Sequence, residues 1–249
     1  MWNDQPVPIV IAHRGDVAYA PENTLTAFKQ AADKGMDAVE FDVKLTADGQ
    51  VIVLHDQTVD RTTNGTGNPS KLPLAALQEL DAGVQFPGQF PGERIPTLDE
   101  VFETVGKRIY MNVELKNYST PFDMLVPKVT QIVKNHGMQE RVLFSSFLAH
   151  NLRKARLLLP EVPRGLLTIP GLLGFWGRTF GWRGDYVALN PYMTDVNARL
   201  VYRIHAAGKR VNAWIVTAEA DIMRMISLGV DGIITDDPAL VLRLLGRGK

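Results

Sequence analysis

The sequence predicts a (β/α)8 TIM barrel, an α/β fold, with a small insertion after a hairpin that ends at His55-Asp56. Eight short apolar runs alternate with helix-like segments almost to the end of the chain, which favours a closed barrel over a doubly wound sheet. The 249 residues, 45% of them hydrophobic, suffice for one large core. Residues 57–94 form a connection too long for an ordinary loop between a strand and a helix. We therefore expect a single domain over residues 1–249, with an inserted subdomain at about 57–94.

The expected strands are short runs rich in β-branched residues, as is typical of strands buried on both faces. In chain order they cover residues 9–12, 38–43, 109–115, 142–145, 165–168, 186–189, 211–216 and 232–235. The carboxyl ends of barrel strands carry the chemistry of this fold, so polar residues that follow these runs are candidates for a site.

The expected helices carry apolar residues at helical spacing and cover residues 24–34, 98–105, 122–135, 150–159, 195–207, 220–227 and 239–245. Asn23 is the expected cap of the first helix, and Gly35 its expected end. Asp237 before Pro238 is typical of a capping residue followed by proline at the first helical position. Three further helices are expected to end at Gly137, Gly208 and Gly229.

One apolar run, residues 51–54, does not fit the alternation and predicts a hairpin with the acidic strand before it. The connection contains Asp48-Gly49, a strong hairpin signal. If the turn centres on this dipeptide, paired positions have numbers that sum to 97, so Asp42 should face His55. The two-residue period also puts Glu40 and Asp42 on one face of their strand.

The bulk composition excludes several classes of protein. Lys plus Arg and Asp plus Glu both number 27, so the net charge is zero, and no basic run indicates nucleic acid as a partner. Because the chain has no Cys, it has neither disulfides nor thiolate metal ligands. No signal peptide is recognisable, and no apolar stretch reaches the ~20 residues of a membrane span. We expect a cytoplasmic location.

The polar residues at the expected strand ends indicate acid–base chemistry beside a metal. His13 and His55 each follow a short apolar run. Glu40, Asp42 and Glu114 would point inward at the same end of the barrel, and carboxylates without thiolates suit a hard cation such as Mg²⁺ or Ca²⁺. Arg14 and Lys116 add positive charge that can hold phosphate oxygens. Such a set suits the cleavage of a phosphoester.

Each of these residues alone is more often structural than functional. A single His after a strand usually packs or donates a hydrogen bond, a Glu-x-Asp pair usually forms a polar face, and a single Lys is usually solvated. Their coincidence at strand ends favours a site. The other three histidines lie in or beside helical segments, and we expect them to be structural: His136, His150 and His205.

The order and spacing of the motifs closely resemble the glycerophosphodiester phosphodiesterase family, over nearly the whole chain. Each motif alone is weak evidence, whereas the set is specific. The matching motifs are His13-Arg14-Gly15, Pro21-Glu22-Asn23-Thr24, Glu40-Phe41-Asp42-Val43, His55-Asp56, Glu114-Leu115-Lys116, Ala213-Trp214 and Gly229-Val230-Asp231-Gly232-Ile233-Ile234-Thr235-Asp236.

The resemblance implies a barrel enzyme that hydrolyses glycerophosphodiesters, small-molecule substrates, to glycerol 3-phosphate and an alcohol. His13 and His55 would be the general acid and base. One divalent cation, Mg²⁺ or Ca²⁺, would be bound by Glu40, Asp42 and Glu114. The substrate would be contacted by Arg14 and Lys116 at its phosphate and by Trp214 at its glycerol. Which histidine is the base, which metal is bound and which alcohol is released stay open.

Residues 169–182, between the sixth and seventh expected strands, are unusually apolar for a loop on the catalytic side. One interpretation is a short amphipathic helix packed on the barrel. The other is an apolar rim that contacts acyl chains or a membrane surface. That second interpretation would make the enzyme a lysophospholipase D acting on lysophospholipids, with the same phosphorus chemistry.

Two further classes compete with a glycerophosphodiesterase. A non-catalytic barrel that binds phosphorylated ligands would have lost a histidine or a metal carboxylate, and this chain has lost none. A barrel like that of phospholipase C or sphingomyelinase D shares the use of two histidines, but Glu114-Leu115-Lys116 and Trp214 argue for the glycerophosphodiesterase.

Overall fold

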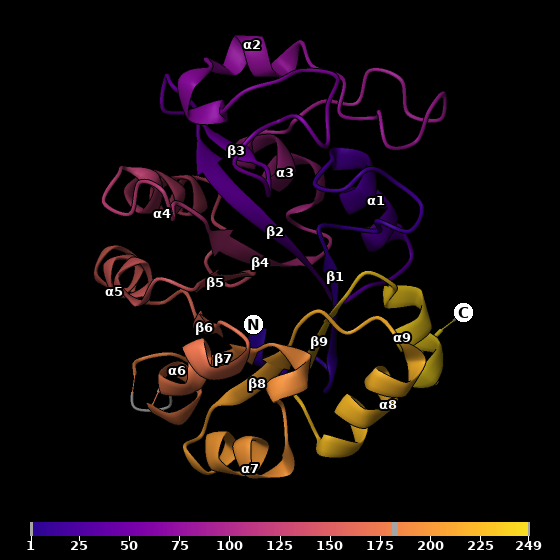
Figure 1. The fold of residues 1–249 in the computed structure, drawn as a ribbon, viewed down its shortest axis with the longest axis vertical. Helices are drawn as coiled ribbons and strands as arrows, with labels where there is room; N and C mark the ends of the chain where they lie inside the picture. Colours follow the sequence, from indigo (N-terminus) through magenta and orange to yellow (C-terminus); the bar gives the residue numbers. More distant parts are fainter. Residues whose placement is uncertain (1, 181–183, 249) are drawn as a thin grey trace.

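The computed structural model describes residues 2–180 and 184–248. Within these residues, eight parallel strands close into a barrel (Figure 1). The sheet order is β1-β9-β8-β7-β6-β5-β4-β2, and pairing of β1 with β2 closes the ring. The predicted TIM barrel is confirmed. Its strands are β1 (Ile9–His13), β2 (Ala38–Leu45), β4 (Tyr110–Leu115), β5 (Val142–Ser146), β6 (Arg164–Thr168), β7 (Ala188–Pro191), β8 (Arg210–Ala213) and β9 (Gly232–Thr235).

Helices surround the barrel and alternate with its strands (Figure 1). The α-helices are α1 (Leu25–Asp33), α2 (Leu74–Gln78), α3 (Leu98–Val105), α4 (Leu125–Asn135), α5 (Ala149–Leu158), α6 (Phe175–Phe180), α7 (Ala198–Ala206), α8 (Glu219–Leu228) and α9 (Pro238–Leu244). Short 3-10 turns are η1 (Trp2–Asp4), η2 (Pro69–Lys71), η3 (Gly171–Gly174) and η5 (Met193–Asp195). Among the described residues, none of these helices has the length and apolar character needed to cross a bilayer.

The helix ends follow the expected chemistry with one exception. Asp237 caps α9 by accepting from the Leu240 backbone N–H at 3.0 Å, as predicted. The expectation that Asn23 caps α1 is wrong, because Thr24 accepts from the Ala27 backbone N–H instead. Asn23 has a φ of 58° and turns the chain into the cap, a conformation that Asn tolerates better than most residues.

The antiparallel strand β3 (Val51–Val53) pairs with β2 outside the ring, as the hairpin signal predicts. The predicted register is wrong by one residue. Val43 pairs with Val53 and Leu45 with Val51, so paired numbers sum to 96. Three residues form the loop: the Gly49 N–H donates to the Thr46 carbonyl, and Gly49 takes a φ of 75°. This is a three-residue hairpin loop whose last residue is in the left-handed region, rather than a two-residue turn.

The region after β3 extends beyond the rim of the barrel, where α2 lies far from the other helices (Figure 1). It has a small apolar core of its own, formed by Ile52, Leu54, Val59, Leu77 and Ile95. The assignment of residues 57–94 as a separate subdomain stays a prediction.

Candidate active site

The carboxyl ends of the strands surround a hollow of about 450 Å³. β1, β2 and β4 supply most of its polar side chains, and the turn after β3 supplies another. All eight residues proposed from the sequence line it: His13, Arg14, Glu40, Asp42, His55, Glu114, Lys116 and Trp214. The register error in the hairpin does not remove His55 from the hollow: the Leu54 backbone N–H donates to the Asp42 carbonyl at 3.0 Å, and His55 follows directly after it.

Glu40, Asp42 and Glu114 bring one carboxylate oxygen each to within 4.8 Å of one another, and all three are buried. Burial, then the charges of Asp42 and Glu114, raises the pKa of Glu40 well above its ordinary value. Burial, then Asp42, raises the pKa of Glu114 to about 7. Burial acts in the same direction on Asp42, but Lys116, His55 and Arg14 outweigh it and hold its pKa at about 2. The cluster therefore holds negative charge at a high electrostatic cost.

These carboxylates fit a divalent cation. Among the described residues, Glu40 Oε2 and Asp42 Oδ2 have no hydrogen-bond partner although they are buried, and buried acceptors of this kind are normally satisfied. Three carboxylate oxygens in a small space are the ligands that Mg²⁺ and Ca²⁺ prefer. A cation there would satisfy both orphan oxygens and relieve the repulsion among the three side chains.

Two cations lie beside the carboxylates. The Lys116 Nζ donates to Asp42 Oδ1 at 3.0 Å. Arg14 Nη1 donates to Glu22 Oε1 at 2.9 Å, and its Nε lies 3.9 Å from Asp42 Oδ2. Arg14 has a φ of 58°, and its backbone N–H donates to the Glu40 carbonyl at 2.7 Å. The backbone thus directs Arg14 toward the carboxylates at the cost of a disfavoured conformation.

Each histidine at the rim has its Nδ1 bound to an aspartate. His13 Nδ1 lies 2.6 Å from Asp236 Oδ1, and His55 Nδ1 lies 2.6 Å from Asp56 Oδ1. Because an ionised carboxylate only accepts hydrogen bonds, Nδ1 must carry the proton in both rings. In the neutral form, Nε2 is then the proton acceptor of each ring. Burial lowers the pKa of His55, against the opposing charge of Asp42.

A chain of contacts joins His55 to Arg14. Asp56 accepts from Arg61 Nε at 2.6 Å, and Glu22 accepts from Arg61 Nη1 at 2.6 Å and from Arg14 Nη1 at 2.9 Å. These contacts hold the pKa of Asp56 below its ordinary value, although burial opposes this. The same network therefore orients one of the histidines and one of the cations.

Comparison with known proteins gives the family. The sequence model of the Glycerophosphoryl diester phosphodiesterase family matches residues 13–240. The chain belongs to this family. A glycerophosphodiester phosphodiesterase of Caldanaerobacter subterraneus subsp. tengcongensis is 41% identical over 241 residues, which cover 96% of this chain and 98% of that protein. One from Bacillus subtilis is 32% identical and covers 93% of this chain and 84% of its own.

Solved structures of the family have the same fold. An Oleispira antarctica phosphodiesterase in complex with the product sn-glycerol-3-phosphate superposes with a TM-score of 0.88 at 33% identity, covering 96% of this chain and 97% of that one. The family and the enzyme class expected from the sequence, a glycerophosphodiester phosphodiesterase, are thereby confirmed.

In this member of the phosphodiesterase family, one side of the hollow is aromatic. Phe147 meets the Trp214 ring edge to face, with centroids 5.5 Å apart, and Tyr118 meets Phe147 in the same way. The Trp214 Nε1 donates to the Asn190 carbonyl at 2.8 Å, which fixes the indole. Tyr118 also donates its hydroxyl to Glu114, and burial followed by that charge raises its pKa. Tyr118 thereby connects the aromatic side to the carboxylates.

The other histidines line no part of this phosphodiesterase hollow. His136 pairs with Asp99 at 2.8 Å, His150 with the Pro121 carbonyl at 2.7 Å and His205 with Asp231 at 2.7 Å. Each of the three rings thus has a partner outside the hollow, and the expectation that these histidines are structural stays a prediction.

Sequence reasoning missed the residues that orient the site. Asp56 and Asp236 stand inside motifs quoted for the family, but nothing in the sequence pairs Asp236 with His13, 223 positions away. Tyr118 and Arg61 carried no signal beyond their proximity in sequence to Glu114 and Asp56.

Proposed function

We propose that the chain hydrolyses glycerophosphodiesters to glycerol 3-phosphate and an alcohol, with His13 and His55 as the acid–base pair. One observation carries the proposal: each of these rings donates from Nδ1 to a carboxylate and so leaves Nε2 for proton transfer at a common hollow. The names of the relatives, and the glycerol 3-phosphate bound to the Oleispira protein, support the same substrate class.

Glu40, Asp42 and Glu114 are proposed to hold one divalent cation, Mg²⁺ or Ca²⁺, which would stabilise charge on the phosphoryl oxygens. Arg14 and Lys116, beside these carboxylates, would contact the phosphate directly. Trp214 would pack against the glycerol, since its side chain is part of the apolar lining of the hollow.

The proposed reaction has two stages. In the first, one histidine removes the proton of the glycerol 2-hydroxyl, and the oxygen attacks phosphorus while the bond to the alcohol breaks. The other histidine gives its proton to the departing alcohol oxygen. Because nucleophile and phosphorus belong to one bound molecule, the attack is effectively intramolecular. In the second stage, water opens the cyclic phosphate, and the histidines exchange roles.

Substitution of the histidines tests this function. His13→Ala and His55→Ala should each lower the turnover of glycerophosphocholine by roughly 10²–10⁴-fold, because each removes a positioned acid or base. His205→Ala, on the exposed side of α7, is the matched control and should keep near-normal turnover. Normal turnover in either rim variant would contradict the assignment.

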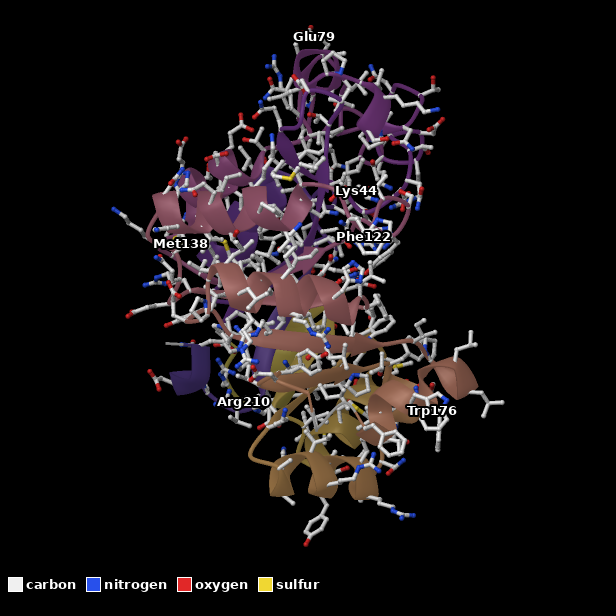
Figure 2. All side chains as sticks on the ribbon, turned by 90° about the vertical axis from the view of Figure 1, so that its left-hand side faces the viewer. Lys44, Glu79, Phe122, Met138, Trp176 and Arg210 are labelled. Atoms are coloured by element: carbon white, nitrogen blue, oxygen red, sulfur yellow. The ribbon has the colours of Figure 1, made fainter. Side chains whose placement is uncertain are left out.

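A second candidate function, lysophospholipase D, is favoured by residues 169–180. This segment is helical, as one interpretation expected, but most of its apolar side chains are uncovered. Leu172 is 91% exposed, Leu173 82% and Trp176 69%, and Figure 2 shows Trp176 at the outer surface. Trp176 stacks on Phe180 with ring centroids 5.3 Å apart. Since the segment follows β6, an apolar rim here could receive an acyl chain or a membrane surface.

The comparison of two substrates decides between these functions. A lysophospholipase D should turn over lysophosphatidylcholine faster than glycerophosphocholine, and Trp176→Ser should weaken only the lipid reaction. A strong preference for glycerophosphocholine in the wild type would remove the second candidate. The cytoplasmic location expected from the sequence stays a prediction, to be tested by cell fractionation.

A further inference from the structure

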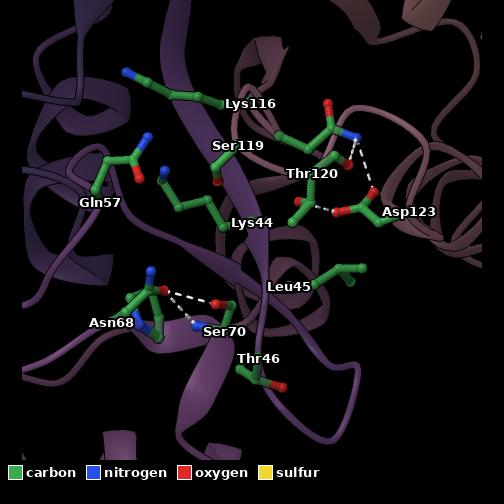
Figure 3. Close-up of a pocket in the computed structure, with 12 residues that line it drawn as sticks. Lys44, Leu45, Thr46, Gln57, Asn68, Ser70, Lys116, Ser119, Thr120 and Asp123 are labelled. Carbon is green, nitrogen blue, oxygen red and sulfur yellow. Dashed lines mark hydrogen bonds between the residues drawn. The ribbon is translucent and has the colours of Figure 1, made fainter.

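A second hollow of about 650 Å³ lies beside the first, between the β2–β3 hairpin, the start of the inserted region and the loop after β4 (Figure 3). Its lining is mainly polar and includes Lys44, Gln57, Ser70, Ser119 and Lys116. Lys116 also lines the hollow with the histidines. The two hollows therefore meet at the lysine proposed to contact phosphate.

Lys44 is a cation without a direct ion-pair partner in the part of the chain that the structure describes, although the charges of Asp42, Glu114 and Asp56 reach it from a distance. It lies two residues after Asp42 on the same face of β2, is half-buried, and extends toward Gln57 and Lys116 in Figure 3. Among the described residues, no carboxylate lies within 4.0 Å of Lys44, and no hydrogen bond engages its ammonium. Lys116, by contrast, is bound to Asp42.

Asp123, the acidic residue in the lining of this hollow, forms no ion pair with Lys44. Both Asp123 oxygens are engaged elsewhere, by the Asn117 amide at 2.8 Å, the Thr120 hydroxyl at 2.7 Å and the Leu125 backbone N–H at 2.9 Å. A half-buried ammonium beside another cation is unfavourable unless an anion reaches it. Asp42, Glu114 and Asp56 act on Lys44 only from a distance, so a ligand anion in the hollow could make the direct contact.

The two sides of the first hollow indicate which part of a bound ligand would carry the anion. Trp214 and Phe147 form an aromatic side that suits the glycerol, and Lys116 marks the polar side. A phosphodiester carries two substituents on one phosphorus. If glycerol lies toward Trp214, the alcohol must leave the phosphate in another direction, and the second hollow offers the space for it.

We propose that the second hollow receives the alcohol part of the substrate and that Lys44 binds a carboxylate on it. This inference rests on the proposed function. It assigns a preference for glycerophosphodiesters whose alcohol carries a carboxylate. The Ser119 hydroxyl and the Gln57 amide are available for the other polar atoms of the alcohol, and Ser70 Oγ, which donates to Asn68 at 2.8 Å, can still accept.

Two substrates isolate the carboxylate, because glycerophosphoserine differs from glycerophosphoethanolamine by that group alone. The ratio of their kcat/KM values should be about tenfold in favour of the serine compound, as is typical of a charge-assisted hydrogen bond. Lys44→Gln should bring the ratio close to one, and Lys44→Arg should retain much of the preference. Lys71→Gln removes the same charge from the exposed neighbour of Ser70, outside the lining, and should leave the ratio unchanged.

Both kcat/KM values are measured on one preparation of each variant, so a partial loss of folded protein cancels in their ratio. If Lys44→Gln does not fold, Lys44→Met, which keeps the aliphatic stem, replaces it. A wild-type ratio of one or less, or a ratio that Lys44→Gln does not change, would overturn the inference. Turnover of both substrates without preference contradicts this inference alone, whereas turnover of neither contradicts the proposed function.

Discussion

At the scale of single residues, the site depends on which nitrogen of each histidine carries its proton. Asp56 and Asp236 fix that choice, although neither lines the hollow. The sequence could point to His13 and His55 because each follows an apolar run that ends at the carboxyl end of the barrel, where the hollow lies. It could not predict that Asp236 touches His13, because that contact exists only after the barrel closes.

Asp236→Asn should lower kcat by roughly 10²-fold or more while changing KM little. An amide can donate to Nδ1, which would favour the ring tautomer that carries its proton on Nε2. The control is Asp99→Asn, which makes the same change beside the structural His136 and should leave kcat within about twofold, as for a surface site. Equal effects of the two variants would mean that Asp236 acts only on stability.

The carboxylate cluster predicts an unusual dependence of stability on pH. In the metal-free protein, the pKa of Glu114 is about 7 against an ordinary 4.5. The folded state thus holds this proton more tightly than the unfolded state, so the stabilisation is full below pH 4.5 and is lost as the pH rises through 7. The Tm of EDTA-treated protein should fall over this range relative to Glu114→Gln, which lacks the group.

Added Mg²⁺ or Ca²⁺ should raise Tm more at pH 8 than at pH 5, because protons compete with the metal for the carboxylates. A difference in Tm between wild type and Glu114→Gln that does not change with pH would contradict this account, as would a metal effect independent of pH.

At the scale of elements, local sequence signals predicted the strands and helices but not always the turns and caps that connect them. The barrel strands were recognisable because both faces are buried, as in β2, whose first six residues are all buried. The hairpin register and the cap of α1 were predicted wrongly for one shared reason. Gly49 and Asn23 take positive φ, and the sequence does not say which of several candidate residues in a turn will do so.

Gly49→Ala should destabilise the protein by about 1 kcal/mol or more, because Ala is strained at a φ of 75°. Gly35→Ala, at the same φ but with open space around it, measures that strain alone. The added Cβ at Gly49 would also meet Lys128 Nζ at 2.7 Å and displace this ammonium from the Gly49 carbonyl, to which it donates. Urea unfolding should therefore show a larger loss of stability for Gly49→Ala than for Gly35→Ala. An equal or smaller loss would mean that the contact with Lys128 contributes nothing.

At the scale of the whole molecule, the alternation of strands and helices allowed the barrel to be predicted. The hollows could not be predicted, because they depend on contacts between distant segments. Lys44 carried no signal of its own, because its role follows from the loop after β4 and the inserted region that surround it. The apolar segment before residue 181 was visible in the sequence, but its exposure was not, since composition alone does not tell a packed helix from an open one.

The contact between His13 and Asp236 lies at the seam where the first strand of the ring meets the last, since β1 pairs with β9. A growing chain on the ribosome has both histidines and all three carboxylates long before Asp236 is synthesised. A product of premature termination short of β9 would contain every residue that we propose for the chemistry and still leave His13 without its Asp236 partner. If the proposed assignment holds, enzymatic competence arrives late in translation, together with the closure of the fold.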